Sequence, residues 1–159
     1  MTSVLILGAT SDVAIACAHV YAKAGCSLYL AGRDQNSLQV LANDLQIRYL
    51  VAATPVVFDA LQFDQHAQIW AQLKPAPTVT ICVFGLLGDQ AISAHDWKAC
   101  KAVIDSNYTG AVSMLNSVAN TYEEQKAGVI VGISSVAGER GRQSNYIYGS
   151  AKAGFSAYL

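Results

Sequence analysis

The sequence is poor in charge. Charged residues make up only 13% of its 159 positions, and 10 lysines and arginines nearly balance 11 acidic residues, so the formal net charge is −1. Domains that bind nucleic acid usually carry a basic face, and this composition supplies none. No apolar run approaches the roughly 18 residues that a membrane-spanning helix needs. The sequence therefore predicts a protein that does not bind nucleic acid and has no integral membrane segment.

Cysteine spacing and the start of the chain indicate the compartment. The cysteines form no Cys-x-x-Cys pattern and lie in apolar stretches, at Cys17, Cys26, Cys82 and Cys100. Such residues are typical of buried thiols in a reducing compartment rather than of a disulfide framework. Met1 leads directly into a strand-like run with no basic region, which argues against a secretory signal peptide. We expect a cytoplasmic protein.

Apolar residues are abundant and regularly distributed. They make up 53% of the chain, and the mean hydropathy is +0.31. Apolar runs predict strands at 3–8, 27–32, 55–59, 78–85 and 127–135. The segments between and after them predict helices at 12–25, 34–47, 64–73, 96–124 and 145–159. This alternation predicts an α/β fold of the Rossmann type, a doubly wound parallel sheet with helices on both faces.

The turn after the first predicted strand is suited to a phosphate. It reads Gly8-Ala9-Thr10-Ser11-Asp12-Val13-Ala14. In doubly wound folds this turn presents free amides at a helix N-terminus, where a pyrophosphate can bind. Only Gly8 of the three usual glycines is present, and we expect Asp12 to cap the helix because its carboxylate would repel a phosphate. An ordinary capped turn explains these residues about equally well.

The second and third strands bear on the choice of dinucleotide. An acid at the end of the second strand usually favours NAD, whereas an arginine there accommodates the 2′-phosphate of NADP. Here the strand ends without an acid and Arg33 follows, so NADP is favoured and NAD is the alternative. Asp34 can pair with Arg33 or, as we favour, cap the next helix. Asp59, at the end of the third strand, can bind the adenine amino group or cap a helix.

A second group of polar residues lies near the end of the chain. Tyr148 and Lys152 are four residues apart in a predicted helix and therefore share one face. An ammonium close to a phenol favours the phenolate, which lets a tyrosine act as acid and base near neutral pH. Ser134 and Ser135 follow the fifth strand at the sheet edge where ligands bind, and a hydroxyl there can polarise a carbonyl.

Together these residues resemble the classical short-chain dehydrogenases/reductases over essentially the whole chain. That family has a glycine-rich first turn, an asparagine in the long helix, and a serine thirteen residues before Tyr-x-x-x-Lys. The spacing selects Ser135 over Ser134 and Tyr148 over Tyr146, and Asn107 matches the helix asparagine. The family's Asn-Asn-Ala-Gly after the fourth strand is replaced by Cys82-Val83-Phe84-Gly85, which keeps only the glycine.

The resemblance implies a role for each matching residue. Tyr148 is expected to be the acid and base, Ser135 to orient the carbonyl, and Lys152 to assist Tyr148 and bind a ribose. Asn107 is expected to hold a water that contacts the lysine. The expected cofactor-binding residues are Gly8, Thr10, Ser11, Asp12, Val13, Arg33, Asp59, Gly85, Tyr148 and Lys152.

The function implied by the resemblance is hydride transfer between a nicotinamide and a small-molecule carbonyl or secondary alcohol, in a homodimer or homotetramer. More narrowly, the segments VFGLLGD, NYTGAVS and SSVAGER resemble the decaprenylphosphoryl keto-pentose (erythro-pentofuranosid-2-ulose) 2-reductase subgroup, so a keto-sugar is one candidate substrate. The alternative is a cofactor-binding but inactive sensor or structural subunit, which the intact catalytic set disfavours. Members of the family continue well beyond the Tyr-x-x-x-Lys helix. We therefore expect residues 1–159 to be a single NAD(P)-binding Rossmann-type domain without the family's C-terminal strands and substrate lid.

The remaining polar residues receive structural interpretations. Arg140 and Arg142, between Ser135 and Tyr148, can contact a phosphate-bearing substrate or, as we favour, remain solvated or pair with Glu139. The histidines have no metal-ligand spacing, so we expect no metal site and only surface or capping roles for His19, His66 and His95.

Overall fold

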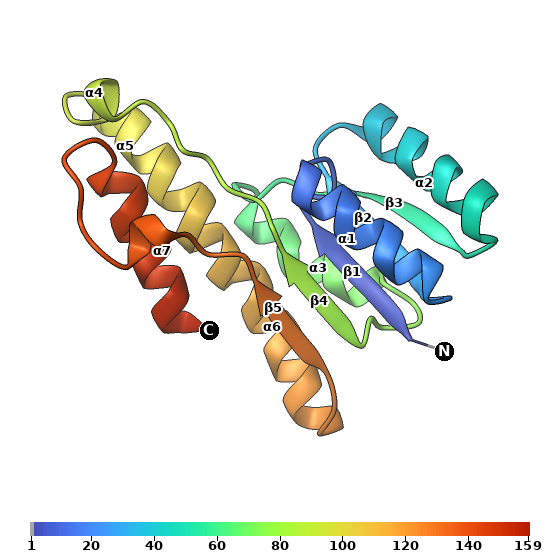
Figure 1. Cartoon of the computed structure of the whole chain (residues 1–159). Coiled ribbons are helices and arrows are strands. Elements are labelled where there is room, and N and C mark those ends of the chain that lie inside the picture. The colour runs from blue at the N-terminus through green and yellow to red at the C-terminus, as the bar shows by residue number, and fades with distance from the viewer. Residues whose placement is uncertain (1) are drawn as a thin grey trace.

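A parallel sheet forms the centre of the computed structural model, which describes residues 2–159. Its five strands have the order β3-β2-β1-β4-β5, and each neighbouring pair is parallel (Figure 1). The strands are β1 (Ser3–Leu7), β2 (Ser27–Gly32), β3 (Ala53–Val57), β4 (Val79–Cys82) and β5 (Val129–Gly132). The predicted Rossmann-type sheet is confirmed.

Helices cover both faces of the sheet (Figure 1). One layer consists of α1 (Asp12–Lys23) and α2 (Gln35–Tyr49), and the opposite layer contains α3 (Phe63–Gln72), α6 (Gly110–Gln125) and α7 (Tyr146–Tyr158). Strand β1 shows how the sequence builds both layers. Val4 and Ile6 belong to the core under α1 and α2, whereas Leu5 and Leu7 belong to the core under α3 and α6. Because both faces are buried, the strand is apolar throughout.

Short helical elements follow β4 and β5 on the way to α6 and α7. They are α4 (Gln90–Ser93), α5 (Trp97–Ile104), the π-helix η1 (Asp105–Thr109) and the 3₁₀-helix η2 (Val136–Gly138). None of the helices described between residues 2 and 159 has the length and apolarity to cross a membrane.

Four strands have different limits from those predicted, and the smallest difference is at β1, which ends at Leu7 rather than at residue 8. β3 begins at Ala53 and ends at Val57, β4 ends at Cys82, and β5 spans Val129–Gly132. The pairing of β4 stops at Cys82 because its partner in β1 is Leu7, the last residue before the turn at Gly8. The residues that follow each of these strand ends therefore form loops at the edge of the sheet where the candidate site lies.

The predicted helix over 96–124 is interrupted. α5 passes into the π-helix η1 and then into α6, and the amide of Gly110 donates to the carbonyl of Asp105, five residues earlier. A π-turn accommodates one additional residue within a helix and often occurs at functional sites. Asn107 lies at the middle of this turn.

Candidate functional site

A cleft of about 350 Å³ opens at the carboxyl ends of β1, β2, β3 and β4. Six of the predicted cofactor-binding residues line it, namely Gly8, Thr10, Ser11, Arg33, Asp59 and Gly85. Asp12 and Val13 are not in its lining but begin α1 next to it. Sequence reasoning missed the rest of the lining, which consists of Gly32, Phe58, Ala60, Leu61, Val83, Phe84, Leu86 and Ser106. Six of these eight residues lie within four positions after the end of β3 or β4, and this closeness to a strand end is the sequence signal that could have identified them.

The β1–α1 turn requires glycine at its first position. Gly8 has φ +86°, and a Cβ built on it would lie 2.7 Å from the backbone nitrogen of Phe84. The amides of Gly8 and Ala9 donate to the carbonyl of Ala31, at 2.8 and 2.9 Å, which ties the turn to the end of β2. The turn is thus held close to two neighbouring strands, where only a residue without a side chain fits.

Ser11, and not Asp12, caps helix α1. The Ser11 Oγ accepts from the amide of Ala14 at 3.4 Å, and the first intrahelical bond runs from Ile15 to the Ser11 carbonyl. The prediction that Asp12 caps this helix is therefore wrong. Asp12 is the first helical residue, where its charge still favours the helix dipole. The amides of Asp12 and Val13 precede the first intrahelical bond and are available to an anion.

Arg33 and Asp34 have separate surroundings. Asp34 caps α2, since its Oδ1 accepts from the Asn36 amide at 3.0 Å and its Oδ2 accepts from the Ser37 hydroxyl at 2.6 Å. The hydrogen bond from Ser37, followed by that from Asn36, lowers the pKa of Asp34 below its ordinary value. The capping interpretation is confirmed. Arg33 is exposed at the cleft and forms no ion pair with any carboxylate described in residues 2–159.

The β3–α3 turn is fixed by a buried histidine. Asp59 Oδ1 accepts from the amide of Leu61 at 3.0 Å. His66 Nε2 lies 2.9 Å from the Asp59 carbonyl, and since that oxygen only accepts, Nε2 carries the hydrogen. His66 Nδ1 lies 3.0 Å from Ser113 Oγ, and the ring packs on Phe58 with centroids 4.9 Å apart.

Of the two roles expected for His66, at the surface or in a cap, the surface position is wrong, because the residue is only 1% exposed. Its partner Ser113 is 47 residues away, so no local pattern reveals the contact. The available signal was the spacing of His66 and Trp70, four residues apart on the buried face of α3. His19 is half-buried, with Nδ1 3.2 Å from the Tyr49 hydroxyl, and His95 is exposed.

Three of the residues predicted to be catalytic, Asn107, Lys152 and Tyr148, lie together beside Gly85, which lines the cleft, although none of the three is in the lining itself. Lys152 is buried, and its Nζ donates to the carbonyl of Ile133 at 3.1 Å and lies 6.0 Å from the centre of the Tyr148 ring. A Cβ built on Gly85 would lie 2.7 Å from Asn107 Oδ1 and 3.4 Å from Lys152 Nζ. Gly85, Asn107 and the Tyr148–Lys152 pair, which come from three distant parts of the sequence, are therefore neighbours.

Asn107 joins the loop after β4 to the π-helix. Its Oδ1 accepts from the amide of Leu86 at 3.2 Å, and its Nδ2 donates to the carbonyls of Leu86 at 2.6 Å and Val103 at 2.8 Å. The side chain is 1% exposed, so these bonds satisfy an amide that would otherwise be costly to bury. They also hold Gly85 and Leu86 at the cleft. The water expected between Asn107 and Lys152 stays a prediction.

The two serines after β5 differ in their contacts. Ser134 Oγ donates to the carbonyl of Lys152 at 3.1 Å and lies 2.6 Å from Ser156 Oγ, so it is bonded to α7. Ser135 Oγ accepts from the Ala137 amide at 3.1 Å, and no acceptor for its hydroxyl hydrogen is found among the described residues. Of the two serines, Ser135 is thus the one whose hydroxyl hydrogen has no acceptor among the described residues, and its role in orienting a carbonyl stays a prediction.

A close contact places Ser135 beside the helix that carries Tyr148. Ser135 precedes η2, and a Cβ built on Gly149 in α7 would lie 2.6 Å from the Ala137 carbonyl of η2. Any larger residue at position 149 would push η2 away from α7. The glycine immediately after Tyr148 therefore sets the separation of the two elements.

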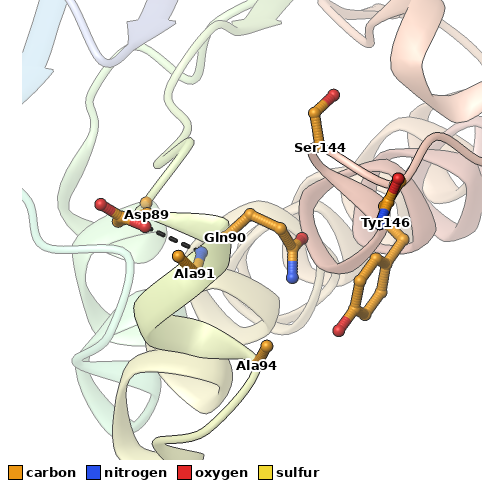
Figure 2. Close-up of a pocket in the computed structure, with 8 residues that line it drawn as sticks. Asp89, Gln90, Ala91, Ala94, Ser144 and Tyr146 are labelled. Carbon is orange, nitrogen blue, oxygen red and sulfur yellow. Dashed lines mark hydrogen bonds between the residues drawn. The ribbon is translucent and has the colours of Figure 1, made fainter.

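A second cleft, of about 640 Å³, lies between α4 and the start of α7 (Figure 2). Asp89 caps α4 beside it, with Oδ1 2.8 Å from the amide of Ala91. Its lining is Gly88, Asp89, Gln90, Ala91, Ala94, Gln143, Ser144 and Tyr146. Arg140 and Arg142 are exposed and line neither cleft, and residues 2–159 show no ion pair between them and Glu139.

Replacing Lys152 is expected to stabilise the fold in a pH-dependent manner. Burial lowers the pKa of Lys152, and the neighbouring Cys82 opposes this shift. Folding therefore disfavours the charged form, and this cost is fully present below the lowered pKa and disappears as the pH approaches the unfolded value of about 10.4. Lys152→Met should raise the free energy of unfolding by about 1–2 kcal/mol at pH 7, and the gain should shrink by pH 11.

Urea unfolding at the two pH values measures this difference. Lys98→Met, which removes an exposed lysine on α5, serves as the control and should change the free energy by less than about 0.5 kcal/mol. A Lys152→Met protein that is less stable than the wild type at pH 7 would show that the ammonium supports the fold.

Comparison with known proteins places the chain among its relatives. Residues 2–159 match the family model of the short chain dehydrogenases. An uncharacterized oxidoreductase of Mycobacterium tuberculosis strain H37Rv is 35% identical over 158 residues, which is 98% of this chain and 63% of that protein. Sulfoacetaldehyde reductase 2 of Chromohalobacter salexigens is 34% identical over 156 residues, 94% of this chain and 61% of the relative.

A solved structure supports the same family. A short-chain dehydrogenase from Sphingobium yanoikuyae in complex with NADPH superposes with a TM-score of 0.89 at 25% identity, covering 97% of this chain and 61% of that one. The chain thus spans less than two thirds of the length of these relatives. On the match of its family model and the fold described above, the chain belongs to the short-chain dehydrogenase family.

Proposed function

We propose that this chain forms the nucleotide-binding and catalytic part of an NADP(H)-dependent oxidoreductase that interconverts a carbonyl and a secondary alcohol. The observation that carries this proposal is the convergence of Asn107, Lys152 and Tyr148 around Gly85, at one end of the cleft over the sheet. We further propose that residues 1–159 are a single NAD(P)-binding domain that works within a homo-oligomer.

The residues along the cleft fit a dinucleotide. The turn at Gly8 leaves no room for a side chain, and the amides that open α1 can bind a pyrophosphate. Arg33 offers a guanidinium without a carboxylate partner among the described residues, which suits a 2′-phosphate. Asp59 and Phe58 line the cleft at the carboxyl end of β3, where an adenine would lie. When bound, NADPH would supply a hydride to the carbonyl carbon.

The side chains at the other end provide the proton chemistry. Tyr148 would donate its hydroxyl proton to the carbonyl oxygen during reduction and take it back in the reverse direction. Ser135 would donate a hydrogen bond to the same oxygen and so stabilise the charge that develops there. The Lys152 ammonium, whose Nζ lies 6.0 Å from the centre of the Tyr148 ring, would face the negative charge that remains on the Tyr148 oxygen after transfer. Asn107 keeps Gly85 and Leu86 in place beside them.

The first experiment measures binding and turnover separately. NADPH and NADH are titrated against the full-length protein, and oxidation of NADPH is then followed with simple ketones and keto-sugars, including a polyprenylphosphoryl keto-pentose. NADPH-dependent reduction of a carbonyl supports the proposal. Tight binding without turnover on any carbonyl would instead indicate a cofactor-binding sensor or structural subunit.

Removal of the Arg33 side chain is expected to affect NADPH selectively. Arg33→Ala should raise the Kd for NADPH about 10- to 100-fold, because a charged hydrogen bond to a phosphate contributes roughly 1.5–3 kcal/mol. The Kd for NADH, which lacks the 2′-phosphate, should change less than about threefold. Arg142→Ala, at an exposed arginine outside the cleft, is the control for the lost charge. Equal losses of affinity for NADPH and NADH would contradict a contact between Arg33 and the 2′-phosphate.

A further inference from the structure

Gln90 bonds to the backbone directly before Tyr148. Gln90 begins α4, and its Oε1 accepts from the amide of Ile147 at 3.1 Å across 57 residues of sequence. Ile147 is the second residue of α7, whose own N-cap residue, Asn145, makes no side-chain capping bond. The first amides of a helix have no intrahelical partner, so an outside acceptor is needed. Gln90 supplies it and thereby fixes the turn of α7 that carries Tyr148.

The other half of the Gln90 amide has no such partner. Its Nε2 is buried, and no acceptor for it is found among the described residues. Asn145 Oδ1, at the start of α7, is likewise buried and lacks a donor within residues 2–159. A buried polar group without a partner costs roughly 1–3 kcal/mol and is uncommon in native proteins. One donor and one acceptor thus remain unused at the same helix end.

These two groups lie beside the second cleft. In Figure 2 the Gln90 side chain extends from α4 toward the start of α7, near Tyr146. The cleft between them is open to solvent and has a volume of about 640 Å³, which can accommodate a small organic molecule. Gln90 lines this cleft, and Asn145 lies between two residues that line it, Ser144 and Tyr146.

We propose that Gln90 is a positioning and specificity residue that selects a hydroxylated ketone as substrate. Its Oε1 holds the α7 turn before Tyr148, while its Nε2 donates to an oxygen of a substrate hydroxyl whose hydrogen is accepted by Asn145 Oδ1. A hydroxyl is the group that serves an unused donor and an unused acceptor together. This inference rests on the proposed carbonyl reduction and specifies the class of its substrate.

The two functions of Gln90 are coupled through one planar amide. The terminal torsion of a glutamine is soft, so a small rotation can bring Nε2 to a ligand while Oε1 keeps its bond to Ile147. A bound hydroxyl then restrains the amide, and the amide restrains the start of α7. A hydroxyl pairs Nε2 on binding, whereas an alkyl group in the same place leaves it unpaired, so the hydroxylated ketone is favoured by roughly tenfold or more.

Two substitutions separate the two halves of the amide. Gln90→Glu keeps an acceptor for the Ile147 amide but removes the donor, whereas Gln90→Met removes both. The probes are 1,3-dihydroxyacetone and pentan-3-one, which have the same number of heavy atoms and differ by hydroxyl against methyl. Gln90→Glu should raise KM for dihydroxyacetone at least about tenfold and change kcat/KM for pentan-3-one less than about threefold. Gln90→Met should lower kcat for both ketones.

Hydrogen exchange of the Ile147 amide provides a measurement that does not depend on activity. It should stay protected in the wild type and in Gln90→Glu, and exchange at least about tenfold faster in Gln90→Met. Gln143→Glu, which adds the same charge to the same cleft without contacting Ile147, should affect the two ketones equally.

The outcomes separate this inference from the proposed function. A wild-type protein that binds NADPH but reduces neither ketone nor any keto-sugar overturns the carbonyl reduction, and the substrate class with it. The Ile147 exchange rates would then still decide the positioning role. If carbonyls are reduced but Gln90→Glu affects both ketones alike, the specificity role is wrong. Unchanged Ile147 exchange in Gln90→Met would refute the positioning role.

Discussion

Tyr148→Phe is expected to lower kcat for carbonyl reduction by about 10³-fold, because it removes the only hydroxyl that we place to protonate the substrate oxygen. The ring remains, so its packing on α7 and its 6.0 Å separation from Lys152 Nζ are retained. The Kd for NADPH should therefore change less than about threefold. Single-turnover kinetics with saturating NADPH measure the chemical step, and equilibrium titration measures binding.

Tyr146→Phe is the matched control for this experiment. Tyr146 is the first residue of α7, two positions before Tyr148, and it is 48% exposed. Its hydroxyl can be removed by the same substitution in the same helix, and kcat should change less than about tenfold. Full activity of Tyr148→Phe would remove Tyr148 from the mechanism. An equal loss in the two variants would attribute the effect to α7 as a whole.

Gly8→Ala is expected to destabilise the protein by about 3 kcal/mol and to weaken NADPH binding at least about tenfold. Two costs add at this position. An L-residue at φ +86° is strained, and the new Cβ would lie 2.7 Å from the nitrogen and 2.9 Å from the Cα of Phe84. Because those neighbours are backbone atoms, the turn must move, and with it the amides at the start of α1.

Gly25→Ala isolates the first of these costs. Gly25 has nearly the same backbone conformation, φ +79°, but a Cβ built there meets nothing within 4 Å. Its loss should be about 1 kcal/mol, without an effect on NADPH binding. Urea unfolding of both variants gives the comparison. Equal destabilisation would mean that the β1–α1 turn yields easily to Phe84 and that its close approach to β4 is not tightly enforced.

The architecture could be predicted from the sequence because its signals are local. Apolar runs and helical spacing indicated the five strands, and the apolar character of β1 follows from burial on both faces. The distance along the chain between Ser135 and Tyr148 also carried information. The structure adds that Ser134 is bonded to α7 and that Ser135 keeps a hydroxyl hydrogen to donate.

The contacts of the buried polar side chains could not be predicted, because they join distant parts of the chain. The partner of His66 is 47 residues away and that of Gln90 is 57 residues away. The prediction of a cap at Asp12 failed for a different reason. Ser11 and Asp12 are both good capping residues, and the start of the helix differs by a single position between the two choices.

The π-helix at Asp105–Thr109 determines how α5 and α6 are rotated relative to each other about the helix axis. Each residue of an α-helix advances the chain by about 100° around the axis, so deletion of one residue here would turn α6 by that angle relative to α5. Val103 in α5 and Val118 in α6 are both buried, and α5 packs beside α7 while α6 packs beside α3. With regular winding, only one of these two faces could meet its neighbour. The additional residue thus lets α5 face α7 and α6 face α3 within one continuous helical segment.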